Sequence, residues 1–137
     1  MDESLIKKIM PHSIEAEQAV IGSMIMDSDA VTAALEILLP EDFYGKQYGT
    51  LFGAMAELNR ENKPIDLVTL QERLKENNVP EELASLEFIR EILNAVPTSA
   101  NVKYYAGIVK EKSLLRKLIR TTDEISAECY QGTEPIE

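Results

Sequence analysis

The sequence predicts an all-α protein, a compact globular bundle of about five to six helices from which a long last helix extends. Apolar residues recur every three or four positions in nearly every segment, and no segment alternates over the length of a strand. Prolines and cap residues divide the first hundred positions into segments of helical length. By contrast, nothing breaks the stretch from Val102 to Gln131, which therefore predicts a single long helix.

Length and charge restrict the kinds of protein this chain can be. Its 137 residues make about one domain, and a net charge of −10 is unfavourable for binding nucleic acid over a whole surface. No apolar run approaches the roughly 18 residues of a membrane span, and the acidic first residues do not match a secretory signal. A single cysteine, Cys129, forbids an internal disulfide and favours the reducing cytoplasm.

The segment PHSIEAEQAVIGSMIMD predicts the first helix of the bundle. Ser13 is placed to cap it, so that Glu15 and Glu17 lie in the first turn, where the helix dipole stabilises negative charge. Its apolar residues fall within an arc of about 140°, interrupted only by Glu17, and they are Ile14, Val20, Ile21, Met24 and Ile25. The small Gly22 and Ser23 would let another helix approach closely.

Two helices are predicted in the next part of the chain. The first begins at Asp27 or Ser28 and ends before Pro40, and the turn EDFYG with its two aromatic residues follows it. The second begins at Lys46 and is stopped at Pro64. Its apolar residues follow the i, i+3, i+4, i+7 pattern, and they are Tyr48, Leu51, Phe52, Met55 and Leu58.

Two more helices precede the long one, and each has a predicted cap. Asp66 caps the segment LVTLQERLKENN, in which three leucines share one stripe, namely Leu67, Leu70 and Leu74. Ser85 caps a helix that runs from about Leu86 to Ala95, and Pro97 is its predicted terminator.

The long helix carries two apolar stripes rotated from each other by roughly 130°. The first consists of Val102, Tyr105 and Val109. The second has the alternating 3 and 4 spacing of a coiled-coil seam, and it consists of Leu115, Leu118, Thr122, Ile125 and Cys129. One helix cannot turn both faces to a single core, so we expect its second half to leave the globular domain.

This reasoning divides the chain into four parts. We predict a flexible tail at residues 1–10, a globular helical domain at 11–112 and an extended helix at 113–131. Residues 132–137 form a tail or the start of a turn, with Gly132 as the cap that ends the long helix.

No set of residues predicts a catalytic or metal site. His12 is the only histidine, and a zinc site would need three or four ligands, which one histidine and one cysteine cannot supply. We interpret His12 as an exposed residue before a helix cap. Glu15 and Glu17 lie on different sides of their helix, so they form no carboxylate pair, and the glycines form no phosphate-binding loop. The residues alone predict a helical binding module that needs no cofactor.

Four blocks of sequence carry a family resemblance, and they are PHSIEAEQAVIGSMI, LLPEDFY, PIDLVTL and NAVPTSANVKYYAGIVKEKSLLRKLI. In this order and at this spacing they resemble the N-terminal domain of the bacterial replicative DNA helicase, the DnaB family, over roughly Pro11 to Glu128. The resemblance implies the collar of a hexameric ring, assembled as a trimer of dimers. It also implies that the motor domain, with its ATP and Mg²⁺, lies downstream and is absent here, so that this fragment is not itself an enzyme.

The same resemblance implies the partners of the domain. In the family the collar recruits the primase DnaG through that enzyme's C-terminal helicase-binding domain, and a helicase loader is a further candidate partner. Family members commonly carry Gly-Gly and a tyrosine where this chain has Ala84, Ser85 and Phe88. The primase contacts map onto Phe88, on the helix before NAVPT, and onto Ile119 and Ile125 on the long helix. In the family, the long helix forms one arm of a helical hairpin, and this hairpin pairs with the hairpin of a second subunit.

Alternatives stay open for each of these residues. Phe88 also suits the core, and Ile125 lies on the seam, where core or subunit packing explains it nearly as well as primase binding. Ile119 lies beside the seam, which favours an exposed contact. A nucleic-acid contact competes with the whole interpretation, because basic residues gather near the C-terminus, namely Lys103, Lys110, Lys112, Arg116, Lys117 and Arg120. A solvated helix face is their simplest explanation, and the net charge favours a protein-binding domain with little DNA binding.

Overall fold

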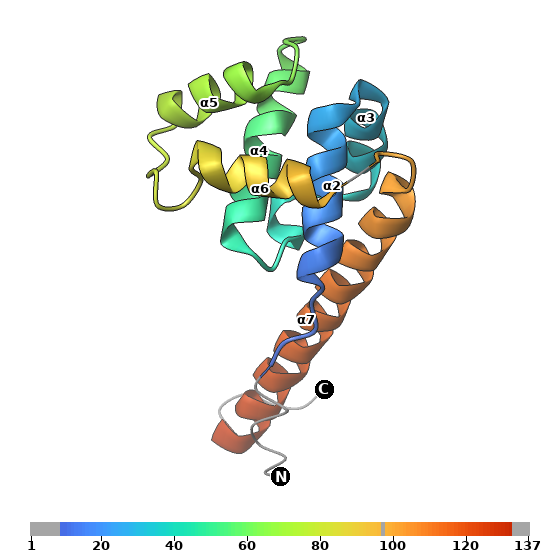
Figure 1. Cartoon of the computed structure of the whole chain (residues 1–137). Coiled ribbons are helices and arrows are strands. Elements are labelled where there is room, and N and C mark those ends of the chain that lie inside the picture. The colour runs from blue at the N-terminus through green and yellow to red at the C-terminus, as the bar shows by residue number, and fades with distance from the viewer. Residues whose placement is uncertain (1–8, 97, 133–137) are drawn as a thin grey trace.

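The computed structural model describes residues 9–96 and 98–132, which form helices and connecting turns without any strand (Figure 1). In chain order the elements are α2 (Ile14–Met26), α3 (Ser28–Ile37), the 3-10 turn η1 (Pro40–Asp42), α4 (Lys46–Arg60), α5 (Leu67–Glu76), α6 (Leu86–Ala95) and α7 (Val102–Gln131). The predicted all-α fold is confirmed. The proposed terminator Pro97 and most of the two predicted tails lie outside the described residues.

Each predicted side-chain cap is found at a helix start. Ser13 accepts a hydrogen bond from the N–H of Ala16 at 3.2 Å, and Ser85 accepts one from the N–H of Phe88 at 3.1 Å. Asp27 and Asp66 cap α3 and α5 in the same way. These bonds satisfy N–H groups that have no partner inside their helix, so the helix starts are fixed by residues close in sequence.

The end of α4 differs from the prediction. The helix stops at Arg60 rather than at Pro64, because Asn62 adopts a left-handed backbone conformation with φ of 60°. Asparagine tolerates this conformation better than most residues. Asn78 takes it after α5, with φ of 57°. Both helices are therefore followed by an asparagine in the left-handed conformation.

Helix α2 lies at the centre of the body and contacts α3, α4, α6 and α7. Most of its predicted apolar arc is buried, whereas Ile14 is exposed because the first turn directs Ala16 and Glu17 inward. The prediction that α2 permits a close approach holds at Gly22, where a Cβ atom would lie 2.7 Å from a Val96 methyl group. The five predicted apolar residues of α4 are all buried.

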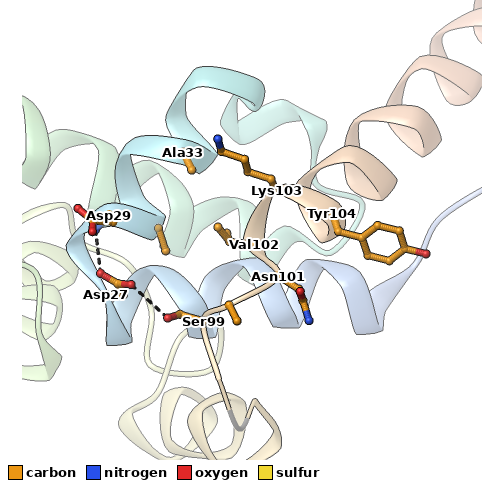
Figure 2. Close-up of a pocket in the computed structure, with 10 residues that line it drawn as sticks. Asp27, Asp29, Ala33, Ser99, Asn101, Val102, Lys103 and Tyr104 are labelled. Atoms are coloured by element: carbon orange, nitrogen blue, oxygen red, sulfur yellow. Dashed lines mark hydrogen bonds between the residues drawn. The ribbon is translucent and has the colours of Figure 1, made fainter.

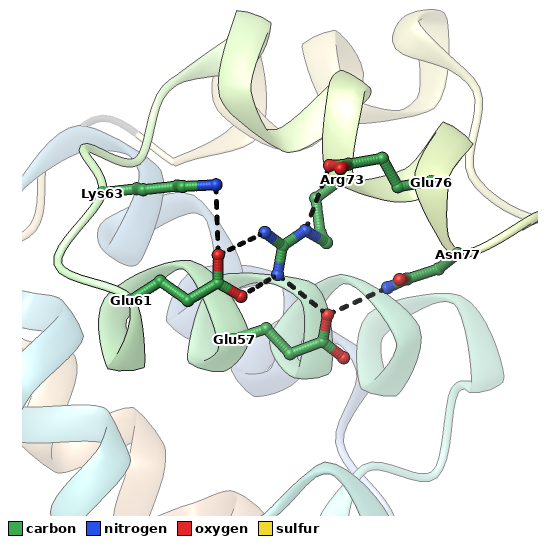
Figure 3. A network of polar contacts seen from close by, with 6 residues as sticks. All are labelled: Glu57, Glu61, Lys63, Arg73, Glu76 and Asn77. Carbon is green, nitrogen blue, oxygen red and sulfur yellow. Dashed lines mark hydrogen bonds and ion pairs between the residues drawn. The ribbon is translucent and has the colours of Figure 1, made fainter.

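A polar network fastens α5 to α4. The guanidinium of the buried Arg73 contacts Glu61 at 2.7 Å, Glu57 at 3.1 Å and Glu76 at 3.3 Å (Figure 3). Hydrogen bonds from Arg73 and Lys63 lower the pKa of Glu61 to about 2. The network therefore keeps the carboxylate of Glu61 ionised and joins Glu57 and Glu61, at the end of α4, to Arg73 on α5.

Helix α7 packs on the body along its first half and extends beyond it along its second (Figure 1). Its body-facing residues are Val102, Ala106, Val109, Ser113 and Arg116, which are all buried. From position 117 to position 132 every residue is exposed. We call this stretch the free half of α7. Within the described residues, no helix is long and apolar enough to cross a membrane.

Candidate interaction surface and its base

The last contacts between α7 and the body are polar and converge on one buried carboxylate. Asp42, at the end of η1, is 0% exposed. It accepts hydrogen bonds from the hydroxyl of Ser113 at 2.6 Å, the ammonium of Lys110 at 3.2 Å and the N–H of Leu39 at 2.8 Å. Burial alone would raise the pKa of Asp42, but these donors outweigh it and hold that pKa below its ordinary value.

Arg116, also buried, ties three parts of the chain together. Its two terminal nitrogens donate to the carbonyl oxygen of Pro11 at 2.8 Å and to that of Asp42 at 2.7 Å. Its guanidinium also lies 5.6 Å from the centre of the Tyr44 ring, within the range of a cation–π contact. The segment before α2, the turn after η1 and α7 therefore meet at one side chain.

Glu17 has a different role from the one predicted. We expected it to stabilise the first turn of α2, but its side chain is buried and points into the turn before α4. Its two oxygens accept hydrogen bonds from the N–H groups of Tyr44 and Gly45, each at 2.9 Å. Burial raises the pKa of Glu17, and these two bonds oppose the rise. Glu17, which interrupts the apolar arc of α2, thus stabilises the turn at Tyr44 and Gly45 through hydrogen bonds.

The interpretation of His12 as an exposed residue is wrong. Its ring stacks on the ring of Tyr44, with centroids 4.0 Å apart and an angle of 8° between the planes. Its Nδ1 atom lies 2.7 Å from the carbonyl oxygen of Met10. The described residues contain no cluster of three or more potential metal-binding side chains. His12 therefore packs the segment before α2 against the body.

A surface pocket of about 490 Å³ lies between the start of α3 and the start of α7 (Figure 2). Its carboxylate Asp27 accepts hydrogen bonds from the N–H of Asp29 at 2.9 Å and from the hydroxyl of Ser99 at 3.2 Å. Tyr104 extends away from these groups in Figure 2. One oxygen of Asp27 thus caps α3, and the other joins the start of α3 to the loop before α7.

The predicted seam begins at Leu115, just before the free half of α7, and continues along the free half with its apolar side chains facing solvent. Leu118 is 63% exposed, Ile125 is 57% exposed, and Leu115 and Ile119 are each 38% exposed. Thr122 and Cys129 are exposed as well. At about 100° per residue, this stripe lies on the side of the helix opposite to the buried residues. A core position for Ile119 or Ile125 is therefore wrong for this chain.

Phe88 lies on α6 and is half-buried. Its ring packs 5.5 Å from that of Tyr48, and its side chain touches the core. Figure 1 places α6 on the body, away from the free half of α7. The structure therefore does not bring Phe88 together with Ile119 and Ile125 on one patch, and the primase-binding role of all three stays a prediction.

The basic run near the C-terminus is partly engaged within the chain. Lys110 and Lys117 lie 3.2 Å and 3.9 Å from the carboxylate of Asp42. Arg116 is buried on two carbonyl oxygens. The solvated face that we predicted is thus wrong for Arg116, and these contacts compete with any phosphate group for the same cations.

The comparisons with known proteins agree with this architecture. Residues 9–111 match the family described as the DnaB-like helicase N terminal domain. The chain belongs to this family. It is 44% identical over its whole length to the replicative DNA helicase DnaB of Geobacillus stearothermophilus, and 40% identical to the replicative DNA helicase DnaC of Bacillus subtilis. It spans about 30% of the length of these two relatives.

Two solved structures resemble this member of the DnaB family. The N-terminal domain of DnaB helicase from Mycobacterium tuberculosis gives a TM-score of 0.89 at 33% identity, over 93% of this chain and 91% of that one. The N-terminal domain of DnaB helicase from Helicobacter pylori gives a TM-score of 0.73 at 23% identity, over 85% and 90%. The second structure is described together with its interactions with primase.

Asp42, Ser113 and Arg116 are the residues at the base of α7 that sequence reasoning missed. One signal for them was present, because Ser113 and Arg116 continue the body-facing stripe four and seven residues after Val109. Polar residues on a buried stripe need buried partners. Their burial also extends the packed part of α7 one turn beyond the boundary at position 112 that we predicted.

Proposed function

We propose that this domain is the oligomerisation collar and the primase dock of an ATP-driven replicative DNA helicase. The observation that carries the proposal is the exposed apolar stripe on the free half of α7, which the body leaves uncovered. Contiguous apolar side chains of this kind mark protein interaction sites. In this proposal the stripe packs against a second copy and against DnaG, within a hexameric ring.

The family relationship supports the choice of partners. Replicative helicases are the relatives of this chain, and the structure from Helicobacter pylori is described with its interactions with primase. By analogy, the C-terminal helicase-binding domain of DnaG contacts Phe88, Ile119 and Ile125 in this chain. A primase domain that touches all three must span α6 and the free half of α7, or bridge two copies of the domain.

The parent protein of this proposal unwinds DNA in the bacterial cytoplasm with ATP and Mg²⁺ bound to a motor domain. The 137 residues of this chain contain no phosphate-binding G-x-x-x-x-G-K loop. This domain therefore contributes assembly and recruitment, and a helicase loader is a further candidate for the same exposed surface.

Binding of a single DNA strand is the competing function. It would use the basic run from Lys103 to Arg120, but the contacts of Lys110, Arg116 and Lys117 with the body reduce what remains for phosphates. The net charge of −10 opposes such binding as well. We therefore favour the protein partner.

Titration of the 137-residue chain with the helicase-binding domain of DnaG tests the proposal. We expect saturable binding that Ile119→Ala weakens by about thirtyfold, the equivalent of about 2 kcal/mol for a hot-spot residue. Val68→Ala is the matched control, since Val68 is also exposed and apolar but lies on α5. Absence of binding to primase, with salt-dependent binding of a labelled single strand instead, would contradict the proposal.

A further inference from the structure

We infer that Asp42, Ser113 and Arg116 form a rigid joint that sets the direction in which α7 leaves the body. In this role they are positioning residues for the exposed stripe, although none of them belongs to it. The consequence for assembly rests on the proposed function. The joint itself rests only on contacts within the chain.

The joint closes the packed part of α7. Apolar contacts hold the helix as far as Val109, and the next two body-facing residues, Ser113 and Arg116, are both polar and buried. Beyond Arg116 no described residue of α7 is buried. The contacts of Ser113 and Arg116 are therefore the last buried ones along the helix, and beyond them only the exposed Lys117 lies near Asp42, at 3.9 Å.

These contacts restrain the orientation of α7 as well as its distance from the body. Ser113 binds the Asp42 carboxylate, while Arg116 binds the Asp42 carbonyl oxygen, so two successive turns of α7 hold both polar ends of one residue. The second terminal nitrogen of Arg116 holds Pro11, on a separate segment. Hydrogen bonds to charged groups are short and directional, whereas apolar contacts are non-directional. The joint thus restrains both the tilt and the rotation of α7.

The joint is complete, and this distinguishes it from an incidental set of polar contacts. No side-chain nitrogen or oxygen atom buried among the described residues lacks a hydrogen-bond partner. A fully satisfied buried network specifies one arrangement, because any shift leaves a buried group unpaired. Lys110 and Lys117 add charge on the same side of the helix, one turn before and one turn after Ser113.

A small tilt at the joint produces a large displacement of the stripe. From Arg116 to Cys129 the helix rises about 20 Å. The angles between packed helices scatter by about 15° within one packing class, and such a tilt moves the far end by about 5 Å. A shift of that size would misalign a seam between two copies, so a flexible joint would weaken assembly without changing any residue of the interface.

Distance measurement between two spin labels tests the joint. Cys129 is exposed and is the only cysteine, so one nitroxide attaches there without further change. The second attaches after Glu72→Cys, at an exposed position on α5. Labelled chain is diluted with unlabelled chain, so that only distances within one molecule contribute. The variants are Asp42→Asn, Ser113→Ala and Arg116→Lys, and the matched controls at exposed sites of α7 are Asp123→Asn and Arg120→Lys.

We expect one narrow distance distribution in the starting chain and in both controls. Asp42→Asn and Arg116→Lys should shift or broaden it by about 5 Å, at a temperature where the far-ultraviolet circular dichroism is unchanged. If either variant fails to fold, the distance distribution of Ser113→Ala tests the joint instead, because this variant removes only one hydroxyl group and should fold. Folded variants that melt earlier but keep the original distribution would show a purely stabilising role and would overturn the inference.

Sedimentation of the same variants separates the joint from the proposed function. Reduced self-association together with a broadened distribution supports both. A starting chain that binds neither a second copy nor primase would contradict the proposed function. The distance distributions would still decide whether the joint is rigid.

Discussion

The carboxylate of Glu17 accepts a hydrogen bond from the N–H of Gly45 at 2.9 Å, across 28 positions of sequence. Its other oxygen accepts one from the N–H of Tyr44. Glu17 thereby fixes the position of the turn that contains Tyr44. The ring of Tyr44 contacts both the ring of His12 and the guanidinium of Arg116. The first helix and the base of the long helix are linked through this turn, so its stability bears on how the exposed stripe is presented.

Glu17→Gln should destabilise the fold. The amide of glutamine offers one acceptor oxygen and one donor nitrogen, so either the Tyr44 or the Gly45 N–H would face a second donor. A buried N–H group left without a partner costs about 1–3 kcal/mol. The bonds of Glu17 to Tyr44 and Gly45 are partly buried, so urea unfolding should show a loss near the lower end of this range. Glu15→Gln makes the same change two residues earlier at an exposed site and should alter stability by less than about 0.5 kcal/mol. Equal losses in the two variants would contradict this role.

Glu17 and Asp42 should affect the pH dependence of stability in opposite directions. Burial raises the pKa of Glu17 above its ordinary 4.5. Its contribution to the free energy of unfolding is therefore fully present below pH 4.5 and is lost as pH rises through the raised pKa. The pKa of Asp42 is held below 3.8, so its contribution is present above pH 3.8 and is lost on further acidification. Urea unfolding between about pH 3 and pH 7 measures both slopes.

Two variants test these two slopes of the free energy of unfolding against pH, and each has a matched control. Relative to the starting chain, Glu17→Gln should flatten the decline above pH 4.5, and Asp42→Asn should flatten the loss below pH 3.8. Glu15→Gln and Asp123→Asn should leave both slopes as they are. Unchanged profiles in the first two variants would mean that other carboxyl groups govern the dependence.

The position at which α7 is cut should decide whether the remaining domain keeps its stability. A chain that ends at Arg120 retains Ser113 and Arg116, whereas a chain that ends at Lys112 loses both donors to Asp42. We expect the shorter chain to be less stable by about 1–3 kcal/mol, the cost of leaving buried polar groups unpaired. Urea unfolding followed by circular dichroism compares the two. Equal stability would place the boundary of the domain at position 112, as the apolar spacing alone predicts.

Leu118→Asp should weaken self-association while leaving the fold intact. The side chain is 63% exposed, so a carboxylate there is hydrated in the single chain, but it would be buried and unpaired in a seam between two copies. Sedimentation of a longer chain that includes a second hairpin arm is the measurement. Leu118→Met keeps the apolar character and should associate normally. A Leu118→Asp oligomer as stable as the original would rule out the seam.

Phe88→Ala and Ile119→Ala should differ in their effect on stability. Phe88 is half-buried against Tyr48, so its truncation should cost about 1–3 kcal/mol, less than the roughly 3–5 kcal/mol of a fully buried phenylalanine. Ile119 is on the free half of α7, and its truncation should cost less than about 0.5 kcal/mol. Thermal melting tests this difference. A large loss at Ile119 would mean that the free half packs on the body in solution.

Local sequence was sufficient to specify the helices and most of their ends. Ser13 and Ser85 cap their helices through bonds that span three residues, and Gly132 ends α7 in a left-handed conformation. Such interactions are local, so the order of residues specifies them. The apolar spacing likewise indicated that α7 has two faces and that only one of them suits the body. The DnaB resemblance rested on the same local blocks.

The partners of the buried polar residues depend instead on how the whole chain packs. Glu17, Asp42 and Arg116 bind groups that are 27 to 105 positions away in the chain. Periodicity shows that such a residue faces inward, but which loop meets it depends on the arrangement of the helices. Hydrogen bonds between distant segments form only after the core has brought the segments together, so only the tertiary structure decides these partners.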